Sequence, residues 1–451
     1  MTDTLAIILA GGRGKRLDPL SRDRAKPAVP FAGPYRIIEF TLSNCLNSGL
    51  RQVLVLTQYK SASLDRHIHS GWGRYFQAGL GECLELIPPQ QRVCDDWYRG
   101  TADAVFQNLY SIERMGAKRV LILAGDHVYK MDYRLMLQFH EQHGRPATVA
   151  CLEVPDTEAA GQFGVMEIDD QHRIVGFQEK PANPKSIPGK PGTCRASMGI
   201  YVFSTDFLRQ ALQVNAAPSA GGPDFGHHLL PSIISRGQAM AHTFEGVASD
   251  RPYWRDVGTL DAYYQASMEL LNREPPLNLY DERWPLRTFE PSLPPPRVAT
   301  AVGGRDVASR PNVFCAGSII DASHVSGSII GRGCRIAPGA VVEDSILMDG
   351  VHVGPGAIVR RAILDKHVQV LAAAIIDGRS PRTDHSHTYS ENGVVCVAKE
   401  EVVGPFAASS PSTRQGEFSA DSNEQEDHRP LPSLRLFPRT TRPQVFADCP
   451  L

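Results

Sequence analysis

The chain of 451 residues has no long hydrophobic run. Its apolar segments are all shorter than the roughly 18 residues that a membrane-spanning helix needs. The first of them, residues 5–10, follows no basic stretch of the kind that begins a secretory signal. We therefore expect this run to be the first β-strand of a cytoplasmic protein that has no membrane partner.

The chain also lacks an excess of charge of either sign. It has 47 Lys and Arg against 49 Asp and Glu, which gives a formal net charge of −2. This balance argues against a protein that binds nucleic acid or an anionic membrane through its overall charge. A local cluster of basic residues then suits a small anionic ligand.

Paired cysteine motifs are missing as well. The nine cysteines are scattered, and no two have the CxxC spacing of common zinc and thioredoxin-type sites. The sequence therefore indicates reduced, mostly buried thiols, which agrees with a cytoplasmic location.

What the chain does have is a glycine loop directly after its first apolar run, with Gly11, Gly12 and Gly14. The basic residues in and after this loop are Arg13, Lys15, Arg16, Arg24 and Lys26. The loop matches neither the P-loop nor the dinucleotide fingerprint, and its glycines alone would also fit a strand-to-helix turn. Because bare backbone N–H groups and fixed cations suit a polyphosphate, the segment predicts a nucleoside triphosphate site.

Lys26 belongs to the segment RAKPAVPF, residues 24–31. Pro27 and Pro30 make a helix between them improbable, so we expect Lys26 to project from a stiff extended segment. A lysine held in place beside a phosphate loop suits phosphoryl or nucleotidyl transfer.

Short runs rich in Val, Ile and Leu alternate with longer amphipathic stretches in residues 1–272. Four of them are QVLVLT (52–57), RVLILAGD (119–126), ATVACLEV (147–154) and GIYVFS (199–204). The alternation predicts an α/β domain built from βαβ units around a mixed, mostly parallel sheet. In such sheets the ligand lies beyond the carboxyl ends of the strands, where the glycine loop and Asp126 are expected.

Two carboxylates are candidate metal ligands. Asp126 in LAGDHVY directly follows an apolar strand, and Asp256 in PYWRDVGT lies between aromatic residues and a glycine turn. Together with a triphosphate they would complete a Mg²⁺ site. Asp126 could equally cap the next helix, which is the other common role of an aspartate after a strand.

Further polar residues stand in short loops. Tyr98 in WYRGTADAV could contact a nucleotide, although such a segment also commonly begins a helix. Other candidates come from FGVM, QEKP and SMGIYVF, and they are Gly164, Glu179, Lys180 and Ser197. Glu179 could accept hydrogen bonds from sugar hydroxyls, and Lys180 is a cation on a loop stiffened by Pro181. Taken singly, each could be ordinary surface.

The rest of the chain divides by composition. Prolines crowd residues 273–312, which predicts a linker. Residues 313–402 repeat small residues, Gly turns and single aliphatics at a spacing near six, which predicts a left-handed parallel β-helix rather than a β-sandwich. The aliphatics expected to stack inward include Ile336, Val342, Val353, Ile358 and Ile363. Residues 403–451 are polar and irregular, and we expect a disordered tail.

Several motifs in order resemble the bacterial glucose-1-phosphate adenylyltransferase family, also called ADP-glucose pyrophosphorylases. They are LAGGRGKRL, RAKPAVPF, DWYRGTADAV, LAGDHVYKMDY, FGVM, EKPANP, SMGIYVF and PYWRDVGT. The similarity runs from about residue 5 to about residue 400 and leaves out the tail. It implies a Rossmann-like nucleotidyltransferase domain followed by a left-handed β-helix, in a homotetramer. It also implies a Mg²⁺-dependent reaction of ATP with α-D-glucose 1-phosphate that gives ADP-glucose for glycogen synthesis.

The resemblance also implies roles for matching positions. Arg16 and Lys26 would hold the triphosphate and the leaving pyrophosphate, and Asp126 and Asp256 would hold Mg²⁺. The nucleotide set would be Gly11, Gly12, Gly14, Gln91 and Tyr98, and the glucose 1-phosphate set Tyr98, Gly164, Glu179, Lys180 and Ser197. The implied chemistry is an in-line attack of a glucose 1-phosphate oxygen on the α-phosphorus of ATP, without a covalent enzyme intermediate.

One position departs from the family. Members activated by fructose 1,6-bisphosphate have a lysine where this chain has Asp23, whereas Arg36 of the matching regulatory segment PYRIIEF is kept. A carboxylate repels a bisphosphate. We therefore expect allosteric regulation in which fructose 1,6-bisphosphate is a poor activator, with fructose 6-phosphate or pyruvate as the first alternatives.

Three other functions are alternatives to this one. A relative that uses UTP, dTTP or GTP is the nearest alternative within the class. A catalytically silent regulatory subunit tends to lose the cations or carboxylates that this chain keeps. A β-helix acyltransferase would need a catalytic histidine in a long coil array, whereas His324, His352 and His367 resemble ordinary turn or surface residues in a short array.

Overall fold

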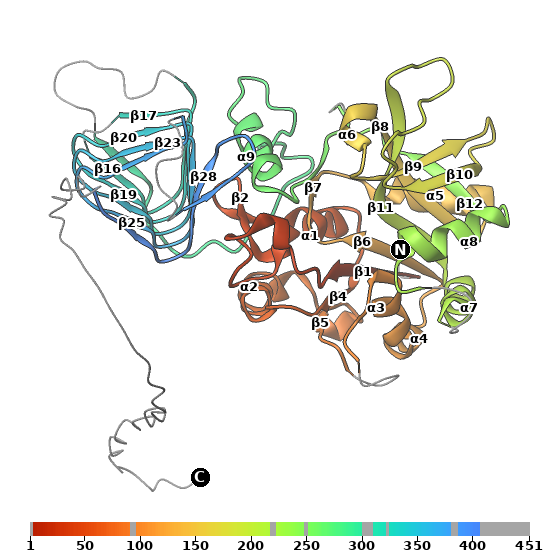
Figure 1. Cartoon of the computed structure of the whole chain (residues 1–451). Coiled ribbons are helices and arrows are strands. Elements are labelled where there is room, and N and C mark those ends of the chain that lie inside the picture. Colours follow the sequence, from red (N-terminus) through yellow and green to blue (C-terminus); the bar gives the residue numbers. More distant parts are fainter. Residues whose placement is uncertain are drawn as a thin grey trace, which may run out of the picture. The chain divides into compact units, whose positions relative to one another are not determined.

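The computed structural model describes residues 3–90, 96–216, 222–247, 251–299, 310–321, 324–379 and 387–405 (Figure 1). The predicted disordered tail, residues 403–451, begins too early, because Val403 ends the last strand of the described chain. From residue 406 onward the tail lies outside these ranges, so its expected disorder stays a prediction there. Within them, no helix is long and apolar enough to cross a membrane. All seven cysteines within these ranges are free and six of them are buried, as expected for reduced thiols.

A nine-stranded mixed sheet forms the centre of the N-terminal part, with the order β10-β9-β11-β6-β1-β4-β5, and with β8 paired to β11 and β12. Its strands are β1 (Thr4–Ala10), β4 (Gln52–Thr57), β5 (Cys83–Ile87), β6 (Arg119–Ala124), β8 (Ala147–Pro155), β9 (Gly164–Ile168), β10 (Ile174–Glu179), β11 (Thr193–Ser204) and β12 (Ala239–Thr243). The β6-β1-β4-β5 half is parallel, and β11 is antiparallel to its neighbours. All four predicted strand runs are confirmed.

Helices pack on both faces of this sheet (Figure 1). One face carries α1 (Ile38–Asn47), α2 (Ala62–Gly71), α5 (Tyr133–His143) and α6 (Asp156–Ala159), and the other carries α3 (Thr101–Gln107), α4 (Leu109–Met115), α7 (Thr205–Asn215) and α8 (Leu230–Ser235). Strand β1 shows why its sequence is a continuous apolar run. Ala6 and Ile8 belong to one core cluster and Leu5 and Ile7 to the other, and all four are completely buried.

The C-terminal part is a parallel β-helix with three sheets (Figure 1). The first sheet contains β14 (Arg297–Ala299), β16 (Ile319–Asp321), β19 (Arg335–Ile336), β22 (His352–Val353), β25 (Gln369–Val370) and β29 (Val402–Val403). The second contains β15 (Val313–Phe314), β18 (Ile329–Ile330), β21 (Ile346–Leu347), β24 (Ala362–Leu364), β28 (Val395–Val397) and β27 (Thr388–Tyr389). The third contains β17 (His324–Ser326), β20 (Val341–Glu343), β23 (Ile358–Arg360) and β26 (Ile375–Asp377). The predicted repeat architecture is confirmed, and its left-handed winding stays a prediction.

The proline-rich stretch contributes to both parts. Strand β14 lies within the predicted linker and pairs in parallel with β16, so the coil pairing begins inside that stretch. In the same stretch, Trp284 is buried and its indole N–H donates to Asn44 Oδ1 of α1 at 2.9 Å. The part of this stretch around Trp284 is therefore packed against α1.

Candidate active site

A cleft of about 1530 Å³ lies beyond the carboxyl ends of β1 and β6. Its walls include the glycine loop, Lys26, Asp126 and Asp256, together with residues from β9, β10 and β11. Pockets for single small ligands usually measure about 300–1000 Å³, so this cleft has room for two substrates side by side. The position is the one expected for a ligand of a parallel α/β sheet.

The glycine loop leaves β1 and lines the cleft. Gly14 has a φ of 62°, in the left-handed region that favours glycine. A Cβ at Gly11 would lie only 3.1 Å from the Cβ of Gln58, so that position also has little room for a side chain. Only a 3₁₀ turn, Lys15–Leu17, follows the loop. The loop is therefore no ordinary strand-to-helix turn, and its backbone faces the cleft.

A two-stranded ribbon brings the two candidate metal ligands together. Asp126 follows β6, and the next residue begins β7 (His127–Tyr129), which is antiparallel to β13 (Trp254–Asp256). In this register His127 is paired with Asp256. The alternative in which Asp126 caps a helix is wrong, because α5 begins at Tyr133 and Asp132 is its cap.

Lys26 joins both carboxylates. Its Nζ donates to Asp126 Oδ2 at 2.9 Å and to Asp256 Oδ1 at 2.6 Å. The expectation that Lys26 stands on an extended segment is wrong, since Lys26–Ala28 forms a 3₁₀ turn. Pro27 is tolerated there because the first turn of a helix does not use that backbone N–H.

The electrostatics of this cluster keep its charges paired. Burial would raise the pKa of Asp126, but the charges of Lys26 and His127 lower it to about 2. Burial would likewise lower the pKa of Lys26, but Asp126 and Asp256 raise it above its usual value. Burial lowers the pKa of His127 against the opposing effect of both carboxylates. The site therefore keeps Asp126 as a carboxylate and Lys26 as an ammonium at neutral pH.

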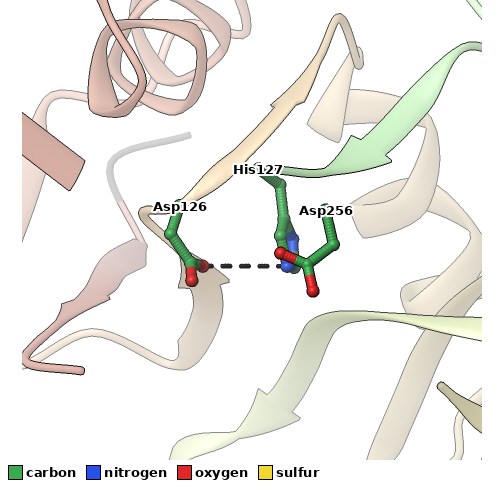
Figure 2. Close-up of side chains that lie close together, drawn as sticks. All are labelled: Asp126, His127 and Asp256. Carbon is green, nitrogen blue, oxygen red and sulfur yellow. Dashed lines mark ion pairs between the residues drawn. The ribbon is translucent and has the colours of Figure 1, made fainter. Parts of the chain in front are cut away.

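The cluster fits a divalent cation. One ligand atom each from Asp126, His127 and Asp256 lies within 4.8 Å of the other two (Figure 2). His127 Nε2 is 3.7 Å from Asp126 Oδ1, and its buried Nδ1 has no hydrogen-bond partner in the described part of the chain. Carboxylate oxygens are the ligands that Mg²⁺ prefers, and an imidazole would add a ligand for softer divalent metals.

Arg16 lies close to the same carboxylates. Its Nη1 donates to Gln162 Oε1 at 3.2 Å, which holds the guanidinium in the wall of the cleft. A Cβ at Gly258 would lie 3.2 Å from Arg16 Nη2 and 3.1 Å from Asp256 Oδ1. Because Gly258 has no side chain, the end of β13, the Asp256 carboxylate and the Arg16 guanidinium can approach one another.

The cleft is also lined by residues that were predicted to bind a sugar phosphate, namely Gly164, Glu179, Lys180 and Ser197. Burial raises the pKa of Glu179. A Cβ at Gly164 would lie 2.9 Å from Glu179 Oε2, and one at Gly226 only 2.5 Å from the same atom. The two glycines therefore leave the space that the Glu179 carboxylate occupies.

Tyr98 lines the cleft, but its hydroxyl is directed into the protein. It accepts a hydrogen bond from Asn108 Nδ2 at 2.8 Å, and the Tyr98 backbone carbonyl accepts one from Gln58 Nε2 at 3.0 Å.

Beside Tyr98 the exposed Trp97 ring stacks on Tyr59, whose hydroxyl accepts from Arg13 Nη2 at 3.0 Å. Stacked rings and a cation at this wall can receive a nucleotide base.

Two predicted site residues remain, Gln91 and Arg36. Gln91 lies outside the described residues, so its placement stays a prediction. Arg36 lies away from the cleft, where its Nη1 donates to the Ser63 carbonyl and hydroxyl oxygens, each at 3.1 Å. Burial lowers the pKa of Arg36 to about 10. A half-buried guanidinium outside the cleft is compatible with a regulatory role but not with contact to the substrates.

Sequence reasoning missed His127, Gln162 and Gly226. His127 could have been found, because it is the neighbour of a predicted metal ligand and is itself a metal-binding residue type. Gln162 and Gly226 gave no signal, since each acts through a partner far away in the sequence, namely Arg16 and Glu179.

Comparisons with known proteins agree with this geometry. A family model described as nucleotidyl transferase matches residues 5–273, and one described as GlmU-like, C-terminal hexapeptide matches residues 294–397. A glucose-1-phosphate adenylyltransferase of Rhodopirellula baltica is 48% identical over 409 residues, which cover 89% of this chain and 91% of the relative. A protein of the same name from Shewanella sp. strain ANA-3 is 49% identical over 343 residues, which cover 76% and 81% of the two chains.

Proposed function

The chain belongs to the glucose-1-phosphate adenylyltransferase family, and from this premise we propose that it joins ATP and α-D-glucose 1-phosphate into ADP-glucose and pyrophosphate. The observation that carries the proposal is the single cleft that contains a glycine loop, a carboxylate pair with Lys26, and a second polar group around Glu179 and Lys180. In a bacterial cell this product would be the glucosyl donor for glycogen.

The proposed mechanism is an in-line transfer. Arg16 and Lys26 bind the triphosphate over the glycine loop and neutralise the charge that develops on the leaving pyrophosphate. Lys180 binds the phosphate of glucose 1-phosphate, and Glu179 accepts hydrogen bonds from the sugar hydroxyls. A phosphate oxygen of the sugar then attacks the α-phosphorus, and the bond to pyrophosphate breaks on the opposite side.

We further propose Mg²⁺ as the metal, held by Asp126 and Asp256. When bound, the ion supplies charge neutralisation at the phosphates of ATP. The two carboxylates are fixed by the ribbon of β7 and β13, and the low pKa of Asp126 keeps that ligand ionised throughout the physiological range.

Regulation and assembly belong to the proposal as well. Small-molecule effectors would act at a site that includes Arg36, and the protein would work as a homotetramer in the cytoplasm. Asp23 is exposed and lies next to the buried Arg24, so its negative charge opposes a bisphosphate at this segment. We therefore keep fructose 6-phosphate and pyruvate ahead of fructose 1,6-bisphosphate as activators.

One assay tests these points together. Pyrophosphate release is measured with glucose 1-phosphate and each of ATP, UTP, dTTP and GTP, and the sugar nucleotide is identified by mass spectrometry. We expect the highest kcat/KM with ATP, and fastest turnover of another nucleotide would reassign the substrate. Effectors are then added to the ATP reaction, where strong activation by micromolar fructose 1,6-bisphosphate would contradict the argument from Asp23.

A further inference from the structure

The ammonium group of Lys26 occupies the space between the proposed metal ligands. It contacts Asp126 Oδ2 and Asp256 Oδ1 at once, and its side chain is only 8% exposed. A divalent cation bound by both aspartates would need the same pair of carboxylates. The Lys26 ammonium therefore competes with the metal for the carboxylates of Asp126 and Asp256.

We infer that Lys26 and the divalent cation exchange on this carboxylate pair. Lys26 neutralises Asp126 and Asp256 until metal and triphosphate bind, and it then leaves them for the phosphates. The inference rests on the proposed function, because that function supplies both the metal and the triphosphate.

Simultaneous occupancy is disfavoured by distance and charge. Mg²⁺ binds carboxylate oxygens at about 2.0–2.1 Å, so it would lie within a few ångströms of an ammonium bonded to those oxygens. A dication and a monocation this close repel each other. One of them has to move, and the lysine has a flexible stem.

The backbone under Lys26 is fixed while its side chain can rotate. The Lys26 carbonyl accepts from the Val29 N–H at 3.0 Å, and Pro27 restricts the turn further. The stem of Lys26 lies against the glycine loop, since a Cβ at Gly14 would lie 3.2 Å from the Lys26 Cβ. Rotation of the side chain alone therefore moves the ammonium from the carboxylates toward a phosphate on the loop.

The exchange has a consequence for the order of binding. If metal bound alone, Lys26 would be left as a buried charge without a partner, which is costly. A triphosphate removes this cost by offering the ammonium new oxygens. Metal and nucleotide should thus strengthen each other's binding, and free metal should bind weakly.

The test is a titration of the full-length protein with Mn²⁺ alone, with free Mn²⁺ followed by electron paramagnetic resonance. Lys26→Met should bind Mn²⁺ more tightly than the wild type, on the order of tenfold. The matched control is Lys15→Gln, which removes a cation that lines the same cleft but donates to neither carboxylate in the described structure. Affinity of Lys26→Met that is no higher than that of the control would overturn the inference.

Two further variants secure this result. Lys26→Gln repeats the measurement with a polar side chain in case the methionine variant does not fold, which circular dichroism would reveal. Adding Asp256→Asn to Lys26→Met should abolish the gain, and a retained gain would place the ion elsewhere and reject the exchange. The titration contains no substrate, so failure of the wild type to make ADP-glucose would refute the proposed function separately.

Discussion

Lys180 illustrates how a single side chain is fixed in this cleft. Its φ of 50° lies in the left-handed region, and its backbone N–H donates to the Phe163 carbonyl at 3.1 Å. Pro181 follows directly. The backbone is thus held from both sides, and the ammonium is displayed beside Glu179 at the cleft wall. Such a cation binds an anionic substrate without ordering a loop first.

Replacing Lys180 by alanine should mainly raise the KM for glucose 1-phosphate. The variant loses a charge-assisted hydrogen bond to the phosphate, which is typically worth about 1.5–3 kcal/mol, or roughly 10- to 150-fold. The KM for ATP should change little. Lys185→Ala is the control, because Lys185 is exposed and paired with Glu167 away from the cleft. Steady-state kinetics with both substrates check this, and an unchanged KM for the sugar phosphate would remove Lys180 from its site.

At the residue scale, the sequence predicted the groups that stand next to a strand end or a glycine loop. Asp126, Asp256 and Lys26 are such groups, and the structure brings them within hydrogen-bond distance. The space for Glu179 depends on Gly226, which is near only after folding. No local pattern contains that information, since it arises from the packing of distant segments.

Local sequence patterns were enough to predict some secondary-structure elements but not the details of others. The apolar runs of the central sheet were predicted well because strands buried on both faces have an unmistakable composition. In the β-helix the spacing of the repeat was clear, but the sequence did not show which residue of each repeat faces inward. Ile336, Val342 and Val353 point inward as predicted, whereas Ile358 is only half-buried and its neighbour Val359 is buried instead. Adjacent aliphatics make a shift by one residue invisible in the sequence.

The start of α5 gives a prediction at this scale. Asp132 caps the helix by accepting from the Arg134 N–H at 2.9 Å, and its carboxylate also accepts from the Arg134 side chain. Asp132→Ala should lower the free energy of unfolding by about 1 kcal/mol. Asp132→Asn should keep most of it, because asparagine is an equally good cap. Thermal unfolding measures the stability of both variants, and kcat should remain that of the wild type. If Asp132→Asn loses as much stability as Asp132→Ala, the stabilisation comes from the ion pair with Arg134 and not from the cap.

On the scale of the whole molecule, side chains from both parts of the chain pack into one cluster. Val257 and Tyr263 of the N-terminal part belong to the same apolar cluster as Ile329, Ile346 and Ile363 of the β-helix. Ile363 was predicted to face inward, but it packs in this shared cluster. The division into 1–272 and 313–402 remains a prediction from composition. The sequence could not reveal contacts between residues so far apart.

A buried ion pair within this region provides the last prediction. Arg24 Nη2 donates to Asp365 at 2.8 and 2.6 Å, and both side chains are almost fully buried. Asp365→Ala would leave a buried guanidinium without its carboxylate, so we expect a loss of about 3–5 kcal/mol in stability. The double variant Arg24→Met/Asp365→Leu removes both charges and should recover most of that loss. The measurement is the thermal midpoint of unfolding of the wild type and of the two variants. A double variant no more stable than Asp365→Ala would show that the unpaired charge does not cause the loss of stability.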